Sequence, residues 1–576
     1  MRIITKLKTA PQSHSEWMRL WGSIQLRDIP RILIVAPSNH AVDNITRRVM
    51  ELGFTSFQTG RFANWKPRIV RVGSDSKDPF VSQVSLRAQA TRLIDMSLEK
   101  LKHELTDVRK RRLEIEKALV LELHKLWRNP KLRGRVDIGN RICTMNDDLL
   151  VQKGIEGRLA QVIQVTTGKL GSKGRGGNAR RRNNKGGTRM SRGQLQRIIE
   201  ESIVGGAQLV CTTLSSSALH VLNKNSSGGA NFEVCIVDEA GQATEPDTLI
   251  PLQHRCKHVV LCGDPKQLPA TVKSRSAKDH MYHRSLFERL SLSGHPVHFL
   301  DCQFRCHPEI YRFPSDAFYG GRVDNGEKNI AKFEKPWHRY LALRPLVFFD
   351  IGEGLGMSGQ ERTASTLSLR NVSEAQFVVS LLKSLGEQLR HDVPNGVEMS
   401  ALDALYRRVA VLTPYRAQVD TIRDAMRERF PGLRNGDAGG SIGTSRKRKR
   451  GREFDVGRRR EADATNIVQS VDKFQGQERD VVILSTVRAE GLGFVRDVQR
   501  MCVALTRGKF SLLIVGNRTN LTQGSKVWRK FFKYLERLDR IVIVRDLSID
   551  PLADFGEVGG ASMDEEDDDD LGYTRI

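Results

Sequence analysis

Two adjacent acidic residues, Asp238 and Glu239, directly follow the apolar run at 234–237. An apolar run that ends in carboxylates is typical of a buried strand in an open α/β sheet, where ligands bind at the carboxyl ends of the strands. At such a place an aspartate can hold hydrated Mg²⁺, and the next glutamate can orient and deprotonate a water for attack on a phosphate. The pair alone is a weak signal, because many strands simply end in polar residues.

Further polar residues stand beside apolar runs later in the chain. They are Gln267 in LCGDPKQLPATV, Phe304 and Arg305 in LDCQFRCHPEI, Gly476 and Glu478 in SVDKFQGQERDVVILSTVR, and Arg507 in RMCVALTRGKFSLLIVGN. The amide of Gln267 can hydrogen-bond both a phosphate oxygen and a water. The turn at Gly263-Asp264 ends the strand that precedes it.

Strand-like apolar runs recur along the chain and must position these residues. They are RILIVAPS, PRIVRVGS, AQLVCTTL, FEVCIVDEA and CKHVVLCGD in the first half, and RPLVFFD, RRVAVLTPYR, DVVILSTVR and FSLLIVGN in the second. Helical segments are interleaved with them, which is typical of parallel α/β layers. The sequence therefore predicts an α/β protein with two parallel-sheet domains in tandem.

Two segments interrupt this pattern. Residues 91–127 contain no Gly or Pro, and their apolar residues recur at near-heptad spacing, which predicts one long helix or a helical hairpin. Residues 167–193 are rich in Gly, Arg, Lys and Asn and cannot bury a core, so we expect a mobile basic loop there. A second Gly/Arg-rich insertion lies at about 432–463.

The predicted domains follow from these patterns. The first domain comprises 1–75 and 201–300, the helical and basic insertion 76–200, the second domain 301–545, and a disordered acidic tail 546–576.

The chain is strongly basic. Its 576 residues carry 93 Lys+Arg against 67 Asp+Glu, a formal net charge of +26, although residues 564–570 read DEEDDDD. This length implies two to four domains. The charge favours a large polyanion, nucleic acid first, as the partner. The alternative is a basic surface without catalysis.

Cysteine usage and hydropathy indicate the redox compartment and argue against a zinc site and a membrane span. Cys211, Cys235 and Cys262 lie in apolar runs that read as buried strands, so we expect a reducing compartment and no disulfide framework. The series Cys302-x3-Cys306-His307 lacks a second ligand pair at zinc spacing, so we reject a metal site there. Because no apolar run approaches 18 residues, we expect a soluble protein without a membrane partner.

A series of motifs in this order resembles the superfamily-one helicases. They are APSNHAVDN, VDEAGQ, GDPKQLPATV, QFRCHP, LTPYRAQ, VDKFQGQERD and VALTRGK. The resemblance is to the branch that contains the up-frameshift helicase, senataxin and the immunoglobulin-mu-binding helicase. It covers about residues 31–75 and 201–520. Each motif is weak alone, but seven in register are specific.

The resemblance implies two RecA-like domains that hold ATP between them and bind single-stranded nucleic acid. By motif position it implies Asp238 as the Mg²⁺ ligand and Glu239 as the catalytic base. It implies Gln267 as the γ-phosphate sensor and Arg305 and Arg507 as the two arginines that reach the γ-phosphate. It further implies Phe304, in place of tyrosine, as the aromatic residue on adenine, and Glu478, with Gly476 in the turn before it, as the acid that contacts the ribose. Arginine suits this role because its planar fork spreads charge over the phosphate oxygens.

The resemblance also implies a strand-binding surface. Its residues are Pro37, Ser38, Asn39, Thr213, Thr413, Pro414 and Tyr415, which match turns that hold the nucleic-acid backbone. Contacts to the backbone imply weak sequence preference and strong salt dependence. The resemblance further implies 5′-to-3′ movement on RNA or DNA. The position of the helical segment at 91–127, similar to the prong of senataxin-type members, hints at RNA–DNA hybrids.

Simpler readings stay open for several residues. Asn39 can be a turn residue only, and Phe304 can be a core aromatic residue at a domain edge. Arg305 and Arg507 can be surface salt-bridge residues, although their place before strands argues against this. The basic runs at 179–182 and 446–450 can be solvated loops that add phosphate affinity, and Arg446 to Arg450 also fits a nuclear import signal. We therefore expect a nuclear protein, with the cytoplasm as the alternative.

The family's glycine-rich phosphate loop, GxxGTGK followed by Ser or Thr, is missing from these residues. No Gly precedes Gly22, and no Gly-Lys-Ser or Gly-Lys-Thr triplet occurs in the 576 residues. Lys6 and Lys8 do not replace the loop, because a lysine without a nest of backbone N–H groups cannot surround the phosphates. The segment 1–10 reads as the helix that follows the loop, so we expect a truncation just after the loop and a chain that folds poorly alone.

Two hypotheses follow. In the first, the protein is an ATP-dependent helicase whose sequence here is truncated. In the second, it is a catalytically inactive nucleic-acid-binding scaffold. The persistence of Asp238, Glu239, Gln267, Arg305 and Arg507 favours the first, because a protein released from hydrolysis would be free to vary there.

Overall fold

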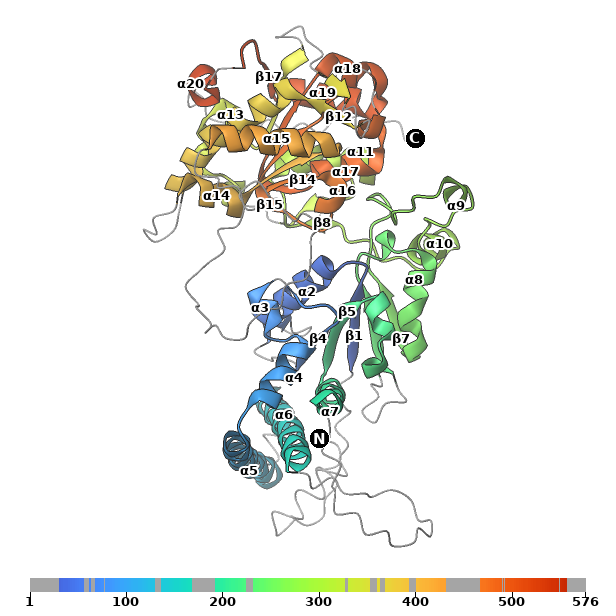
Figure 1. Cartoon of the computed structure of the whole chain (residues 1–576), viewed down its shortest axis with the longest axis vertical. Coiled ribbons are helices and arrows are strands. Elements are labelled where there is room, and N and C mark those ends of the chain that lie inside the picture. Colours follow the sequence, from blue (N-terminus) through green and yellow to red (C-terminus); the bar gives the residue numbers. More distant parts are fainter. Residues whose placement is uncertain are drawn as a thin grey trace, which may run out of the picture. The chain divides into compact units, whose positions relative to one another are not determined.

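The computed structural model describes residues 31–55, 62–63, 68–76, 78–129, 136–167, 192–223, 232–326, 330–352, 360–362, 368–392, 400–430, 467–488, 491, 493–547 and 550–556. They divide into two compact units (Figure 1). The first unit comprises 1–265 and 269–296, and the second comprises 266–268 and 297–576. The segments around residues 1–10, 432–463 and 564–570, on which several predictions fall, lie outside the described residues.

The first unit is built on a parallel sheet. Its described strands lie in the order β4-β5-β1-β6-β7 and all pair in parallel. Their bounds are β1 Ile32–Ala36, β4 Ile69–Val72, β5 Leu209–Thr213, β6 Val234–Val237 and β7 His258–Leu261. One face packs on α2, and the other packs on α4 to α7. Each strand coincides with an apolar run of the sequence, so its prediction is confirmed.

The second unit repeats this architecture. Its described strands lie in the order β14-β13-β15-β16-β10-β17, again all parallel. Their bounds are β10 Leu346–Asp350, β13 Val409–Thr413, β14 Val468–Ser470, β15 Arg479–Ser485, β16 Gly508–Gly516 and β17 Ile541–Ile543. Alternate residues of β10, β13, β15 and β16 enter two separate cores, one with α13 to α15 and one with α11, α17 and α19. The predicted fold class, two parallel α/β units in tandem, is confirmed.

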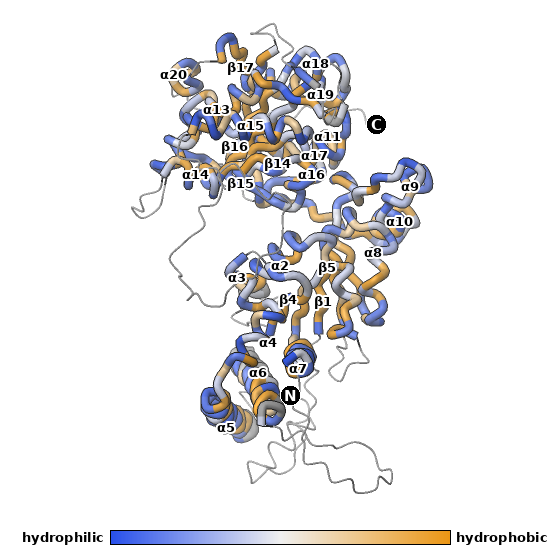
Figure 2. Tube along the Cα trace, in the orientation of Figure 1, coloured by the Kyte–Doolittle hydropathy of each residue, from blue (hydrophilic) through white to orange (hydrophobic). Residues whose placement is uncertain are grey.

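Helices connect the strands in both units. In the first unit they are α2 Asn39–Leu52, α3 Pro79–Ser82, α4 Leu86–Asp95, α5 Leu98–Arg128, α6 Val136–Thr166, α7 Arg192–Gly206, α8 Glu245–Leu249, α9 Arg275–Asp279 and α10 Leu286–Leu292. In the second they are α11 Pro308–Tyr319, α13 Val372–His391, α14 Ala401–Arg408, α15 Arg416–Arg429, α16 Val471–Phe474, α17 Val498–Leu505, α18 Arg518–Gly524, α19 Lys526–Arg537 and α20 Pro551–Phe555. Figure 2 shows the strands of both sheets largely in orange, the colour of hydrophobic residues.

Three short strand pairs lie outside the two main sheets. They are β2 Phe54–Thr55 with β3 Phe62–Ala63, β8 Cys302–Gln303 with β9 Asp324–Asn325, and β11 Gln360–Arg362 with β12 Leu369–Asn371.

The predicted helical segment at 91–127 corresponds mainly to α5, which forms a helical hairpin with α6 and begins later than predicted. Residues up to Asp95 belong to α4, and Ser97 caps a new helix, α5, by accepting a hydrogen bond from the Lys100 backbone. Sequence spacing missed this break because Met96 and Ser97 interrupt the helix without a Gly or Pro. Helices α5 and α6 lie side by side (Figure 1) and are joined by ion pairs from Arg109 and Arg112 to Glu156.

Part of the predicted acidic tail is folded, which corrects that prediction. Helix α20 begins after Asp550, whose carboxylate accepts hydrogen bonds from the Leu552 backbone and from the Ser384 hydroxyl. Leu552 and Phe555 pack against the core under α13. The sequence analysis did not predict these apolar contacts, because it assigned the whole segment to the acidic tail.

Strand β7 also departs from its predicted burial. Val259 and Val260 are 44% and 45% exposed, and Cys262 after them is exposed as well, whereas Cys211 and Cys235 are buried as predicted. The reason is that β7 pairs with β6 on one side and, among the described residues, with no strand on the other. An edge strand with apolar side chains and unpaired backbone groups is unfavourable when exposed to water, because it can pair with another chain.

No helix within the described ranges is long and apolar enough to cross a membrane.

Candidate functional site

The predicted acid pair stands at the carboxyl end of β6 in the first unit. Asp238 donates its backbone N–H to the Val35 carbonyl of the adjacent strand at 2.8 Å, which fixes where β6 ends. Glu239 adopts a left-handed backbone conformation with φ 51°, which turns the chain directly after β6. Burial raises the pKa of the Asp238 carboxyl, and the backbone N–H of Glu239 offsets part of this effect.

Two glycines let the turns after β6 and β7 approach each other. A Cβ atom at Gly263 would lie 2.7 Å from the Gly241 nitrogen, and one at Gly241 would lie 3.1 Å from the Asp264 carbonyl oxygen. The Ala240 N–H donates to the Cys262 carbonyl at 2.7 Å across the same contact. The motif glycines are therefore explained by packing that holds the acid pair, and the side-chain amide of Gln242 donates to the Glu239 carboxylate within it.

The predicted strand-binding residues of the first unit gather at one edge of its sheet. Pro37 to Asn39 follow β1, and Thr213 ends the neighbouring β5 opposite Ala36. The Ser38 hydroxyl caps α2 by accepting a hydrogen bond from the Ala41 backbone at 3.1 Å. The Thr213 hydroxyl accepts one from the Ser216 backbone at 3.2 Å. The structure thus brings these residues together and leaves Ser38 and Asn39 exposed.

A buried arginine, not foreseen from the sequence, supports this edge. Arg71 on β4 is 1% exposed, and its guanidinium donates to Asp43 at 3.0 Å and to the side-chain oxygen of Asn39 at 2.7 Å. A Cβ at Gly73, where φ is +122°, would come within 2.9 Å of this guanidinium. Because its oxygen is used by Arg71, the Asn39 amide turns its donor end away from the guanidinium. Asn39 is therefore more than a turn residue.

Replacing Arg71 with alanine should lower the free energy of unfolding by about 3 kcal/mol, since it leaves Asp43 and Asn39 without their buried partner. Urea denaturation measures this loss. Arg87→Ala is the matched control, because Arg87 is 71% exposed in its ion pair with Asp75 and should cost at most about 1 kcal/mol. Equal midpoints for the two variants would contradict a structural role for Arg71.

In the second unit, three charged residues form a compact cluster. Arg305 donates to the Glu478 carboxylate at 2.6 Å, and Lys509 lies 3.1 Å from the other oxygen of the same carboxylate. Burial raises the pKa of Glu478, but Arg305 and Lys509 outweigh it and hold that pKa below its usual range. Two predicted site residues thus contact each other. Lys509, near the start of β16, was missed by the sequence reasoning.

Arg507 is held more tightly than its neighbours. It is 2% exposed, and its guanidinium donates to the Val503 carbonyl at 3.0 Å and to the side-chain oxygen of Gln267 at 3.0 Å. Residues 266–268 cluster with the second unit, so this contact lies within that unit. A buried guanidinium with several acceptors is not a surface salt bridge, which removes that reading for Arg507.

The remaining predicted nucleotide contacts flank this cluster. Phe304 is 73% exposed, so it is not a core aromatic residue, and its ring lies against Gly326, where a Cβ would come within 2.1 Å of it. Gly476 has φ 78°, a conformation that favours glycine, in the turn between α16 and β15. Their roles toward a nucleotide stay predictions.

Two of the residues predicted in the second unit to match a strand-holding turn have buried side chains, and their role toward a strand stays a prediction. Thr413 is 0% and Tyr415 is 5% exposed. The Tyr415 hydroxyl accepts a hydrogen bond from Arg488 at 2.6 Å. Burial makes Thr413 and Tyr415 supports of the turn after β13. Arg488, at the end of the neighbouring β15 region, is the half-buried cation that sequence reasoning missed.

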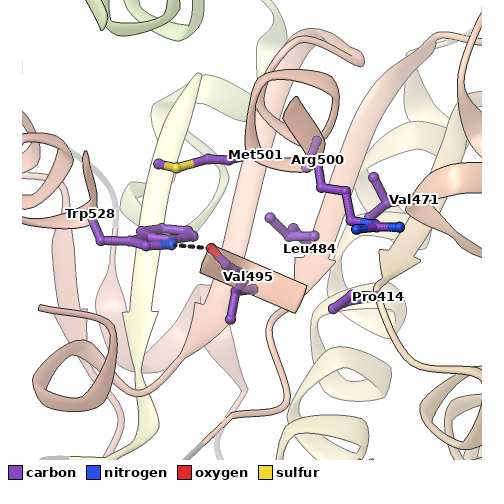
Figure 3. Close-up of a pocket in the computed structure, with 8 residues that line it drawn as sticks. Pro414, Val471, Leu484, Val495, Arg500, Met501 and Trp528 are labelled. Atoms are coloured by element: carbon purple, nitrogen blue, oxygen red, sulfur yellow. Dashed lines mark hydrogen bonds between the residues drawn. The ribbon is translucent and has the colours of Figure 1, made fainter. Parts of the chain in front are cut away.

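An apolar hollow lies beneath Pro414 at this edge (Figure 3). Its walls include Leu484, Met501 and Trp528, whose indole N–H donates to the Val495 carbonyl at 3.0 Å. The hollow has a volume of about 20 Å³, enough for one water molecule. It is too small to take a nucleotide base.

A wider groove of about 660 Å³ lies in the first unit beside Gly73. Arg87 and Arg197 line it together with Glu200 and Glu201. This mixture of signs does not favour a polyanion.

The first unit ends a strand in an acid pair, and the second holds the buried Arg507 and the half-buried Arg305–Glu478 ion pair. Two parallel α/β units with such residues are typical of the class of nucleotide-dependent motor proteins. Comparison with known families agrees. Residues 4–275 and 282–519 each match a family model described as an AAA domain.

Curated relatives are helicases by name. The chain is 38% identical over 346 residues to "Probable helicase MAGATAMA 3" of Arabidopsis thaliana, covering 60% of this chain and 37% of that one. It is 32% identical over 517 residues to "Helicase SEN1" of Saccharomyces cerevisiae, covering 88% of this chain and 20% of that one. It is 30% identical over 358 residues to "Probable helicase senataxin" of Homo sapiens, covering 59% and 11%. The chain therefore spans well under half the length of these relatives.

The chain belongs to the superfamily-one helicases of the Sen1 and senataxin type. The resemblance inferred from the motifs is confirmed.

Proposed function

We propose that this chain is the motor of an ATP-dependent helicase or translocase that moves 5′ to 3′ along single-stranded nucleic acid. The observation that carries the proposal is that each of the two units of the family fold holds its own group of predicted site residues. The acid pair Asp238 and Glu239 follows a strand of the first unit, and in the second the buried Arg507 donates a hydrogen bond to the half-buried Gln267.

The acid pair is suited to hold Mg²⁺ and a water. Asp238 is half-buried, and burial raises its pKa, so a cation beside it would stabilise the carboxylate against that desolvation. The described residues hold no cluster of three or more acidic, histidine or cysteine side chains that could bind a metal. Mg²⁺ needs no such cluster, because it commonly binds one or two carboxylates and the substrate phosphates. When bound, the ion would neutralise charge on the phosphates.

Glu239 has the geometry of a base. It stands in a left-handed turn directly after Asp238, and the side-chain amide of Gln242 donates to its carboxylate. A carboxylate oriented in this way can accept the proton of a water that attacks the γ-phosphate.

The arginines supply the complementary charge. Arg507 is buried and held by fixed acceptors, which favours stabilisation of a transition state over loose binding. We assign Arg305 to the γ-phosphate, and Phe304, Gly476 and Glu478 to the adenine and ribose. Nucleotide binding must then compete with the Arg305–Glu478 ion pair.

The strand-binding surface is assigned to the carboxyl edges of the two sheets. In the first unit it comprises Pro37, Ser38, Asn39 and Thr213, and in the second it comprises Pro414, supported by Thr413 and Tyr415. We propose RNA, DNA or RNA–DNA hybrids as substrates and the nucleus as the location. The basic run at 446–450 that motivates the location lies outside the described residues.

The second candidate is an inactive nucleic-acid-binding scaffold, favoured by the missing phosphate loop in these 576 residues. Reading the genomic DNA upstream of the first codon separates the two. An in-frame GxxGTGK followed by Ser or Thr supports the helicase. A stop codon or unrelated sequence supports the scaffold.

The direct test measures strand-stimulated ATP hydrolysis and single-strand binding. Residues 1–576 alone should bind ATP weakly and hydrolyse it negligibly, whereas a chain extended through an upstream phosphate loop should hydrolyse it at about 1–10³ per second. Strand affinity should fall steeply as salt increases. Robust turnover by residues 1–576 would contradict the need for the loop, and strand binding without turnover by the extended chain would support the scaffold.

A further inference from the structure

Val487 has an unusual backbone conformation. Its φ is 69°, in the left-handed region, although its side chain is β-branched and fully buried. Such a conformation costs about 1–3 kcal/mol and persists only where the surroundings enforce it. Strain of this kind commonly lies at functional sites, and Val487 lies just after β15, between the buried Thr486 and Arg488.

A buried glutamate enforces it. Glu374, in the first turn of α13, is 0% exposed, and one of its carboxyl oxygens accepts hydrogen bonds from the Val487 backbone N–H at 2.9 Å and from the Ser485 hydroxyl at 2.6 Å. The side-chain amide of Asn371 donates to the Val487 carbonyl at 3.3 Å. Both peptide groups of Val487 are therefore held from helix α13 and its cap.

These contacts belong to a closed polar network. Gln418 on α15 exchanges two hydrogen bonds with the Asn371 backbone, at 2.7 and 3.0 Å, and donates to the Ser485 hydroxyl at 3.1 Å. The other oxygen of Glu374 is buried and has no hydrogen-bond partner within the described residues. Burial raises the pKa of Glu374 to about 7, so near neutral pH the neutral carboxylic acid is well populated. A neutral amide is then a fair substitute for this side chain.

The network ends at the exposed edge of the sheet. Arg488, directly after Val487, donates to the Tyr415 hydroxyl, and its guanidinium carbon lies 5.5 Å from the Tyr415 ring centroid. Gly493 leaves room for this pair, since a Cβ there would lie 2.0 Å from the Arg488 guanidinium. Val487, Tyr415 and Leu369 form one small buried cluster. The direction of Arg488 therefore depends on the turn at Val487.

We propose that Glu374 is a positioning residue, which holds Val487 in its left-handed conformation and so fixes Arg488 as a phosphate-binding cation at the carboxyl edge of the second sheet. The proposal rests on the proposed function, because it assigns this edge to the phosphate backbone of a single strand. Glu374 acts through Val487 and does not touch the strand itself.

The test compares single-strand affinity, measured by fluorescence anisotropy on a labelled oligonucleotide without nucleotide, among variants of the full chain. Glu374→Ala should weaken binding about tenfold, because about 1.4 kcal/mol of backbone strain is then free to relax. Glu374→Gln retains an acceptor for Val487 and Ser485 and should stay within about threefold of the parent. Glu387→Ala is the matched control, since Glu387 is an exposed residue on the same helix.

A second variant separates positioning from general damage. Glycine adopts φ 69° without strain, so Val487→Gly combined with Glu374→Ala should bind more tightly than Glu374→Ala alone. If Glu374→Ala is insoluble, Glu374→Asp, which withdraws the carboxyl by one methylene, takes its place with an intermediate loss expected. A folded Glu374→Ala protein with parental affinity, or a Glu374→Gln protein as weak as Glu374→Ala, would overturn the proposal. Failure of the parent chain to bind any strand would instead overturn the proposed function.

Discussion

Replacing Glu239 with glutamine should reduce ATP hydrolysis by a factor of about 10²–10⁴ and leave single-strand binding unchanged. Glutamine keeps the size and shape of the side chain but cannot accept the proton of an attacking water. The left-handed turn and the close approach of Gly241 to Gly263 remain in place, so the substitution alters the chemistry and not the fold. The measurement is phosphate release at saturating ATP and strand, in a chain extended through an upstream phosphate loop.

Glu233→Gln provides the matched control. Glu233 stands just before β6, forms an exposed ion pair with Lys257 at 3.1 Å, and lies at the opposite end of the strand from the acid pair. The Glu233→Gln variant should hydrolyse ATP at the rate of the parent. Hydrolysis by the Glu239 variant at the parental rate would refute its assignment as the base, and a parallel loss of strand binding would indicate a folding defect instead.

Much of the fold could be predicted because a buried parallel strand has a recognisable local sequence pattern. A strand buried on both faces is a short apolar run, and each such run became a strand. The acid pair could be placed for the same reason, since residues that follow parallel strands meet at one edge of a sheet. The break between α4 and α5 could not be placed, because a serine cap such as Ser97 leaves a weaker signal than Gly or Pro.

What could not be predicted depends on contacts between distant segments. Arg71 sits in a strand where a charged residue suggests an exposed face, yet it is buried because Asn39 and Asp43 on α2 supply its acceptors. Tyr415 was assigned to the strand surface by its motif, yet Arg488 covers its hydroxyl from 73 residues away. Contacts of this kind between distant side chains follow no periodic pattern in the sequence, so they cannot be predicted from a local segment.

The clearest case is Glu374. Its place in the first turn of a helix is typical of a solvated capping residue. It is instead fully buried because two hydrogen-bond donors, 111 and 113 residues further along the chain, reach it. Sequence reasoning identified the motif that contains Val487 but not the residue that shapes it.

Replacing Arg507 with lysine should lower the kcat for ATP hydrolysis by about 10³, with a smaller change in the KM for ATP. Lysine keeps the charge and most of the stem, so the buried site stays filled. It cannot, however, present the planar fork with which Arg507 donates to the Val503 carbonyl and to Gln267 at the same time. A buried arginine held by fixed acceptors acts mainly on charge that develops in the transition state, which is why kcat carries the loss.

The control for this variant is Arg529→Lys on α19, where the side chain is exposed and donates a long hydrogen bond of 3.4 Å to the Thr522 carbonyl. Both variants should unfold at similar temperatures, because lysine retains the volume that the core around α17 requires. A parental kcat for Arg507→Lys would show that charge alone suffices there, and a raised KM with parental kcat would move Arg507 from the chemical step to nucleotide binding. The predicted pattern, a loss in kcat with the fold intact, requires the fork itself, and the Gln267 oxygen 3.0 Å from Arg507 fixes its direction.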